Sequence, residues 1–287
     1  MTDLDHPATA SGTITIGGDL TVRRLGFGAM RITGEGIWGD PPDRETALAV
    51  LRRAVELGVN FIDTADSYGP EVSERLIADA LRPYPDDLVI ATKAGLVRPG
   101  PGRWEADGRP EHLREACNGS LARLQTERID LYQFHRPDPE VPIEESLGTL
   151  LELQQEGKVR HIGVSNVDES QLARARAVVE VVSVQNRYNP TDRGSEWAVE
   201  VCQRDGLAFL PWAPIGGGQA GGDAVDEIAA AHEATARQVV LAWLLARSPA
   251  ILPIPGTGSV DHLESNVAAA QLELTTDEVA TLTALAT

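Results

Sequence analysis

The sequence predicts an α/β protein: a single (β/α)8 TIM barrel with an N-terminal β-hairpin and an extra C-terminal helix. Eight short apolar runs alternate with longer segments of helical period, and too few residues remain for a second domain. The runs are apolar almost throughout, as expected for parallel strands that are buried on both faces. The length of 287 residues is usual for one such barrel.

The elements follow one another in a regular order. The opening segment "TITIGGDLTV" alternates Ile14 and Ile16 ahead of two glycines, which predicts a hairpin. The eight expected strands then occupy residues 24–30, 60–65, 88–95, 129–135, 160–166, 181–186, 207–214 and 251–256.

Helices are expected between these strands. "DRETALAVLRRAVELG" begins at an acidic residue and ends in Gly58, as a capped helix does. "PIEESLGTLLELQQEGK" runs from Pro142 to a glycine near its end, and "DEIAAAHEATARQVVLAWLLARSP" predicts two consecutive helices. A last helix is expected to open with Thr276. We therefore divide the chain into a flexible N-terminus (1–12) and one barrel domain (13–287).

An open, doubly wound sheet is the alternative fold. Eight strand–helix units favour closure into a barrel. The dinucleotide-binding fingerprint of the open fold is also incomplete, because "GFGAMR" has Arg31 where its third glycine belongs.

The composition excludes several classes of partner. The net charge of −18 disfavours nucleic acids and anionic membranes, so any phosphate-bearing ligand must be held by a local arrangement. The two cysteines are far apart, which favours a reducing cytoplasm over a disulfide framework. Neither a signal peptide nor an apolar run of about 20 residues is seen. The six histidines lack ligand spacing. We expect a cytoplasmic monomer with no metal.

Four polar residues fall at the ends of neighbouring expected strands. Asp63 ends the second strand and Tyr68 lies on its loop, Lys93 lies near the end of the third strand, and His135 ends the fourth. Barrel enzymes place their chemistry at this end of the strands. A lysine about 4 Å from a tyrosine favours tyrosinate, and burial opposes it, so a modestly lowered pKa is expected for Tyr68. The four residues predict a site that protonates an oxygen.

These motifs resemble the aldo-keto reductase family. The residues "DTADSYG", "ATKAG" and "YQFH" match its pattern in order, and "GFGAM", "HIGVSN", "VQNRYN", "WAPIGGG" and "IPGTGSVDHLESN" extend the resemblance over nearly the whole chain. It implies NAD(P)H-dependent reduction of small aldehydes or ketones without a metal. In this family Tyr68 would be the general acid, Lys93 and Asp63 would tune it, and His135 would orient the carbonyl.

The resemblance also implies a cofactor site. Trp212 would stack on the nicotinamide ring. Two residues stand where many relatives have a Lys and an Arg that contact the 2′-phosphate, namely Gly256 and His262. We therefore expect NADPH, with a weaker preference over NADH than in those relatives. The remaining implied cofactor residues are Gly28 and Met30, Ser165, Asn166 and Gln185 at the carboxamide, Pro214, Ile215 and Gly216 at the pyrophosphate, and Thr257, Ser259 and Asn266 at the adenosine end.

The substrate pocket is expected to be open. The sequence ends in "TLTALAT", so we expect the long C-terminal loop of many relatives to be missing, and residues 96–112 predict a mobile flap instead. Trp38, Arg103 and Trp104 are the expected pocket residues. "RLGFGAM", "GIWGDPPDR", "DSYGPEVSE" and "LRPYPDDLVIATKAG" resemble the bacterial pyridoxal reductase branch, which implies a small aromatic aldehyde as substrate.

Two other functions remain open at this stage. Potassium-channel β subunits share the implied fold, so a cofactor-binding regulatory subunit with little turnover is one alternative. A barrel glycosidase is another, but it needs a second carboxylate near Asp63 and the neighbouring strand ends supply none.

Overall fold

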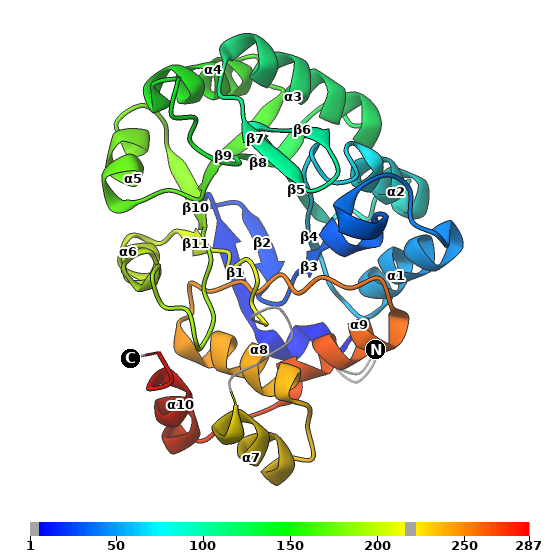
Figure 1. Ribbon diagram of the computed structural model, residues 1–287, viewed down its shortest axis with the longest axis vertical. Helices are drawn as coiled ribbons and strands as arrows, with labels where there is room; N and C mark the ends of the chain where they lie inside the picture. Colours follow the sequence, from blue (N-terminus) through cyan, green and yellow to red (C-terminus); the bar gives the residue numbers. More distant parts are fainter. Residues whose placement is uncertain (1–5, 216–221, 287) are drawn as a thin grey trace.

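The structure is a computed structural model that describes residues 6–215 and 222–286, and its central feature is the predicted barrel (Figure 1). Seven parallel strands form one curved sheet in the order β11-β10-β9-β8-β5-β4-β3. They are β3 (Phe27–Gly28), β4 (Phe61–Asp63), β5 (Val89–Ala94), β8 (Ile129–Phe134), β9 (Val159–Ser165), β10 (Val181–Gln185) and β11 (Ala208–Phe209). The closed arrangement excludes the open sheet.

Residues 250–255 fill the eighth strand position and close the barrel. On one side the amide of Leu252 donates to the carbonyl of Phe209 at 2.9 Å, and on the other the amide of Gly26 donates to the carbonyl of Pro253 at 2.9 Å. The segment carries two prolines, which have no N–H to donate. A regular ladder therefore does not form here, although carbonyls of the segment still accept bonds from the neighbouring strand.

Two glycines allow the first and eighth strands to approach closely. A Cβ on Gly28 would lie 2.6 Å from the carbonyl oxygen of Ile254, and a Cβ on Gly256 would lie 2.5 Å from the oxygen of Gly28. No real Cβ tolerates such distances, so any side chain would push the strands apart. The backbone is thereby exposed at the floor of the barrel mouth, where both glycines line a cavity.

The helices surround the sheet as predicted (Figure 1). Asp43 caps the first helix by accepting a hydrogen bond from the amide of Thr46 at 3.1 Å. The barrel helices are α1 (Arg44–Glu56), α2 (Val72–Leu81), α3 (Pro110–Leu124), α4 (Ile143–Gln155), α5 (Glu169–Arg176), α6 (Glu196–Asp205), α8 (Ala236–Arg247) and α9 (Val260–Ala268). Outside them lie α7 (Asp223–Ala231) and α10 (Thr276–Thr283), and the short 3-10 turns are η2 (Pro7–Ser11), η3 (Ala29–Ile32), η4 (Glu35–Ile37) and η6 (Ala269–Gln271).

Within the described residues no helix is both long enough and apolar enough to cross a membrane.

The N-terminal hairpin closes the bottom of the barrel. Strands β1 (Thr13–Ile16) and β2 (Leu20–Arg23) pair antiparallel, as the sequence predicted, and their apolar side chains join the core inside the sheet. The flexible N-terminus that we expected through residue 12 is corrected for residues 7–11. They form η2, where Ala8 is fully buried and its amide donates to the carbonyl of Leu57 at 3.1 Å.

The segment expected to form a mobile flap begins with a second hairpin. Strands β6 (Leu96–Gly100) and β7 (Arg103–Ala106) pair antiparallel directly after β5. The Gly- and Pro-rich composition of this segment favoured an irregular loop, but Gly100 and Gly102 lie at or beside the turn of the hairpin. The hairpin stands at the mouth of the barrel, on the side where β5 and β8 end (Figure 1).

Candidate active site

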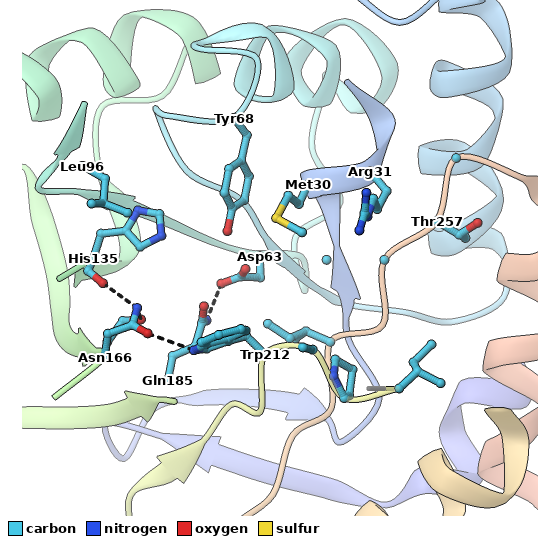
Figure 2. A pocket seen from close by; sticks show the side chains of 18 of the residues that line it. Met30, Arg31, Asp63, Tyr68, Leu96, His135, Asn166, Gln185, Trp212 and Thr257 are labelled. Atoms are coloured by element: carbon cyan, nitrogen blue, oxygen red, sulfur yellow. Dashed lines mark hydrogen bonds between the residues drawn. The ribbon is translucent and has the colours of Figure 1, made fainter. Parts of the chain in front are cut away.

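A cavity of about 800 Å3 opens at the carboxyl ends of the strands. This volume is typical of a small-molecule or cofactor site. Figure 2 shows that side chains from several strands point into it. The predicted site residues that line it are Gly28, Met30, Asp63, Tyr68, Trp104, His135, Ser165, Asn166, Gln185, Trp212, Pro214, Ile215, Gly256, Thr257 and His262.

Asp63 is the centre of the buried polar network. Its Oδ2 accepts a hydrogen bond from Nζ of Lys93 at 2.7 Å. Its Oδ1 accepts from Nε2 of Gln185 at 2.8 Å and from Nε2 of Gln133 at 3.1 Å. Because Asp63 lies on β4 and its partners come from β5, β8 and β10, one carboxylate connects four strands of the barrel. Gln133 escaped the sequence analysis, although a glutamine within the apolar run "LYQF" was a detectable signal.

Lys93 connects this network to Tyr68. Its ammonium donates to the carbonyl oxygen of Thr64 at 2.7 Å and to the hydroxyl of Tyr68 at 3.4 Å. The side chain of Lys93 is fully buried and does not line the cavity, whereas Tyr68 is 7% exposed and does. The phenol is therefore the member of the pair that a ligand can reach.

The pKa of Tyr68 is raised, whereas the sequence analysis expected it to be modestly lowered. Burial raises the pKa of the phenol, and the nearby Lys93 ammonium only partly offsets this effect. Burial also works against the charge of Lys93, but the attraction of Asp63 prevails and the pKa of Lys93 is raised. Desolvation depends on how completely the chain covers each group, which strand spacing alone does not reveal. In the protein as described, Tyr68 is a protonated phenol held beside a charged lysine.

His135 lies on the other side of Tyr68. The two rings meet edge to face with centroids 6.0 Å apart, and Oγ of Ser67 lies 3.5 Å from Nδ1 of the imidazole. Burial, with smaller contributions from the positive charges of Lys93 and Arg136, lowers the pKa of His135 well below its ordinary value. A neutral imidazole offers one N–H donor, which suits it to hold a carbonyl oxygen beside the phenol.

Asn166 joins the histidine strand to the expected nicotinamide platform. Its side-chain nitrogen donates to the carbonyl of His135 at 3.0 Å, and its side-chain oxygen accepts from Nε1 of Trp212 at 3.1 Å, as Figure 2 shows. Asn166 has a left-handed backbone with φ of 56°, as does Ala213 with φ of 50°. Such conformations are uncommon outside glycine and concentrate at functional sites.

Some predicted cofactor residues lie elsewhere. Ser259 and Asn266 are not among the described residues that line the cavity. The hydroxyl of Ser259 instead caps α9 by accepting from the amide of His262 at 3.4 Å. Gly216 lies outside the described residues.

Three arginines that sequence reasoning missed line the cavity. Arg136 follows His135 directly and lies at the Tyr68 end. Arg31 and Arg237 line the same cavity as Thr257, and Figure 2 shows Arg31 beside Thr257. Arg31 directly follows the "GFGAM" motif, so its position was detectable. Arg237 lies in the first turn of α8, and no local pattern points to it.

Of the three predicted substrate residues, one lines the cavity and two are not among its described lining residues. Trp104 lines the cavity and meets Tyr68 edge to face, with centroids 6.5 Å apart. Arg103 is a correction, because its side chain is 66% exposed and pairs with Glu105 at 2.6 Å instead of lining the described cavity. Trp38 is likewise not among the described lining residues and lies behind the hairpin, against Arg98.

The part of the chain that the structure describes contains no cluster of metal ligands. No group of three or more His, Cys, Asp or Glu side chains is arranged there to hold an ion. The polar groups of the cavity include hydrogen-bond donors such as Tyr68 and His135 beside the aromatic faces of Trp104 and Trp212, which suit an organic cofactor and a carbonyl.

A closed barrel with an Asp–Lys–Tyr network and a histidine at the mouth of a cofactor-sized cavity defines a class of carbonyl oxidoreductases. Comparison with known proteins identifies the family. Residues 24–287 match the model of the aldo/keto reductase family. The chain belongs to this family, and it is an NAD(P)H-dependent aldo-keto reductase that acts on small molecules.

Individual relatives agree with this assignment. The chain is 44% identical to pyridoxine 4-dehydrogenase of Escherichia coli over 281 residues, covering 95% of this chain and 98% of the relative. It is 46% identical to an uncharacterized oxidoreductase of Schizosaccharomyces pombe, covering 96% and 90%. A thermostable aldo-keto reductase solved with the inhibitor epalrestat superposes with a TM-score of 0.84 at 33% identity, covering 95% and 99%. An aldo-keto reductase of Klebsiella pneumoniae solved with NADPH has a TM-score of 0.79 at 28% identity, covering 94% and 93%.

The lowered pKa of His135 predicts a pH dependence of stability. The unfolded chain binds a proton at this residue near pH 6.5, and the folded chain does not, so the stability that the neutral imidazole contributes is complete above about pH 6.5 and is lost as the pH falls. Between pH 7 and pH 5, wild type should lose more unfolding free energy than His135→Asn, because only wild type has this imidazole to protonate on unfolding. Urea unfolding of both proteins at both pH values measures the difference, and equal losses would contradict it.

Proposed function

We propose that this protein reduces small aromatic aldehydes, pyridoxal among them, with NADPH as the reductant and Tyr68 as the proton donor. The observation that carries the proposal is the network at the cavity floor, in which Asp63 holds Lys93 at 2.7 Å and Lys93 reaches the hydroxyl of Tyr68 at 3.4 Å. An aldo-keto reductase must protonate the oxygen of its substrate, and Tyr68 is the protonated group of this network that faces the cavity.

Each residue of the site has its own role in the reduction. A bound NADPH supplies the hydride. The N–H of neutral His135 holds the carbonyl oxygen near the phenol, and Tyr68 gives its proton to that oxygen as negative charge develops there. Lys93 then stabilises the tyrosinate through its hydrogen bond, and Asp63 keeps Lys93 charged and oriented. A general acid of high pKa is useful in this setting, because it stays protonated until the carbonyl oxygen becomes basic.

The cavity fits a dinucleotide along its length. Trp212 offers an indole face beside Asn166. The side-chain nitrogen of Gln185 donates to Asp63, and its Oε1 remains available as an acceptor. At the other end Gly28 and Gly256, which have no side chains, line the cavity with backbone atoms. These features support a nicotinamide near Tyr68 and a phosphate-bearing end near Thr257.

Two arginines support NADPH over NADH. Gly256 and His262 provide no permanent cation where many relatives have two, but Arg31 and Arg237 line the cavity, and Arg31 lies beside Thr257 (Figure 2). In a protein of net charge −18 such local cations offset the repulsion of an anionic group. We assign the 2′-phosphate of NADPH to this pair of guanidinium groups.

The substrate half of the cavity favours flat rings. Trp104 and Tyr68 form an edge-to-face pair beside His135, and aromatic walls pack well against aromatic ligands. The E. coli relative is named as a pyridoxine 4-dehydrogenase, and the oxidation of a hydroxymethyl group on an aromatic ring is the reverse of the reduction of an aromatic aldehyde. Pyridoxal has the required ring and aldehyde.

Replacing the proton donor tests the mechanism. Tyr68→Phe should lower kcat by a factor on the order of 10²–10⁴, the usual contribution of a general acid. NADPH affinity should barely change, because the ring is retained. Steady-state assays at 340 nm and fluorescence titration of NADPH measure the two quantities, and near wild-type turnover would exclude Tyr68 as the acid.

Replacing Arg31 and Arg237 together tests the cofactor assignment. The double variant Arg31→Gln/Arg237→Gln should bind NADPH about tenfold more weakly and NADH with unchanged affinity, since an exposed charged contact is worth roughly 1–2 kcal/mol. Arg136→Gln, at the opposite end of the cavity, is the matched control and should leave both affinities unchanged. Fluorescence quenching measures them, and wild-type NADPH affinity in the double variant would refute the assignment.

A substrate panel tests the pocket. With NADPH, kcat/KM should be higher for small aromatic aldehydes, including pyridoxal, than for aliphatic ketones or open-chain sugars. Trp104→Ala should raise KM for the aromatic substrates more than it lowers kcat, because the wall binds ground and transition states alike. Higher kcat/KM for sugars or aliphatic ketones would overturn the aromatic preference and leave the reductase class intact.

A further inference from the structure

Arg98 is a buried arginine whose described hydrogen-bond acceptors are all backbone carbonyls. It lies on β6, directly behind the cavity wall, and is only 8% exposed. Its Nε donates to the carbonyl of Arg103 at 3.0 Å, and its Nη2 donates to that of Gly36 at 3.2 Å. Its Nη1 donates to the carbonyls of Ile37 at 2.9 Å and Ser67 at 3.3 Å. Burial lowers its pKa, and hydrogen bonds to four carbonyls compensate part of the lost hydration.

The four carbonyls belong to three separate segments of the chain. Gly36 and Ile37 lie in η4, between β3 and α1, and Ser67 directly precedes Tyr68 in the loop after β4. Arg103 begins β7 of the hairpin. One guanidinium therefore joins the η4 turn, the loop that carries the phenol, and the hairpin. A planar group with five N–H donors is the side chain best suited to such a task, and a lysine cannot reproduce its geometry.

The same guanidinium lies between two indole rings. Its Cζ is 3.6 Å from the ring centroid of Trp104 and 5.5 Å from that of Trp38. These distances are within the range of cation–π attraction. Trp104 in turn lines the cavity and contacts Tyr68 edge to face. A continuous series of contacts thus leads from Trp38 through Arg98 and Trp104 to the phenol.

The η4 turn is held in a conformation that it would not choose alone. Ile37 has φ of 60°, in the left-handed region that a β-branched residue rarely adopts. Such strain persists only where surrounding contacts determine it. The carbonyl of Ile37 accepts from Arg98, and the next residue, Trp38, forms a β-bridge with Gly69 beside the phenol.

We propose that Arg98 is a positioning residue for substrate selection: by binding the carbonyls of three segments and stacking against Trp104, it holds that indole beside Tyr68 and so makes the wall that recognises an aromatic ring. Arg98 does not touch the substrate. It acts through Trp104, and the aromatic wall is complete only when the three segments are joined. The choice of an aromatic probe rests on the proposed function, whereas the role of Arg98 is tested by a comparison between variants.

The test compares two aldehydes in three variants. Arg98→Met keeps the apolar stem and removes every donor, Arg98→Lys keeps one charge without the fork, and Arg52→Met is the matched control. Arg52 is an exposed arginine on α1 that also donates to a carbonyl, that of Ala80 at 3.4 Å, far from the cavity. The substrates are 4-nitrobenzaldehyde, which is large enough to contact the wall, and propanal, which offers no ring. KM and kcat are measured for each, with the NADPH affinity by fluorescence.

For Arg98→Met we expect KM for 4-nitrobenzaldehyde to rise about tenfold, with a smaller fall in kcat, while KM for propanal and the NADPH affinity stay within about twofold of wild type. Arg98→Lys should restore part of the aromatic KM, and Arg52→Met should match wild type for both aldehydes. The ratio of the two KM values does not depend on the folded fraction of a preparation, so a purely structural defect leaves it unchanged.

Two results would overturn the role of Arg98. One is an aromatic KM within twofold of wild type in Arg98→Met, and the other is an equal rise of KM for both aldehydes. The comparison is made between each variant and wild type, so it holds whichever aldehyde wild type prefers. A wild type that favours propanal would refute the proposed substrate class, and the change in the KM ratio would still decide the role of Arg98.

Discussion

The buried carboxylate of Asp63 is the interaction on which the arrangement of the barrel mouth depends. An ionised side chain that is almost fully buried is costly unless its oxygens are satisfied, and here both oxygens accept from Lys93, Gln133 and Gln185. These donors come from three other strands, so satisfying one charge sets the relative positions of four strand ends. The carboxylate of Asp63 holds the Lys93 ammonium in place by a hydrogen bond. In that position Lys93 donates a hydrogen bond to the hydroxyl of Tyr68.

The closure of the barrel creates the space in front of this network. The eighth strand position approaches β3 so closely that only glycines fit at positions 28 and 256, and both lie on the wall of the cavity. The same compact contact that completes the sheet therefore presents bare backbone to a ligand. Trp212 and Asn166 add an aromatic face on the other side, linked to His135 by hydrogen bonds.

The cavity has two ends of different character. Near Tyr68 the walls are aromatic, with Trp104 held from behind by Arg98. Near Thr257 lies the guanidinium group of Arg31, a local positive charge in a strongly acidic molecule. Hydride transfer needs both ends at once, since a reductase must anchor a charged dinucleotide and place a small carbonyl compound against its ring. The barrel supplies this combination because loops from all its strands converge on one mouth.

The sequence alone determined the alternation of strands and helices, the hairpin and the capped helix ends. These features depend on local patterns among residues that are close together in the sequence. It also indicated Asp63, Tyr68, Lys93 and His135, since parallel strands bring their carboxyl ends to one edge. Only the tertiary structure decided the rest. Arg237 reaches the cavity through the packing of α8, and Arg98 meets carbonyls from two distant segments as well as from its own hairpin, so neither leaves a local signature. The raised pKa of Tyr68 and the irregular eighth strand have the same origin, because desolvation and strand pairing are set by neighbours that the chain brings together only when the barrel closes.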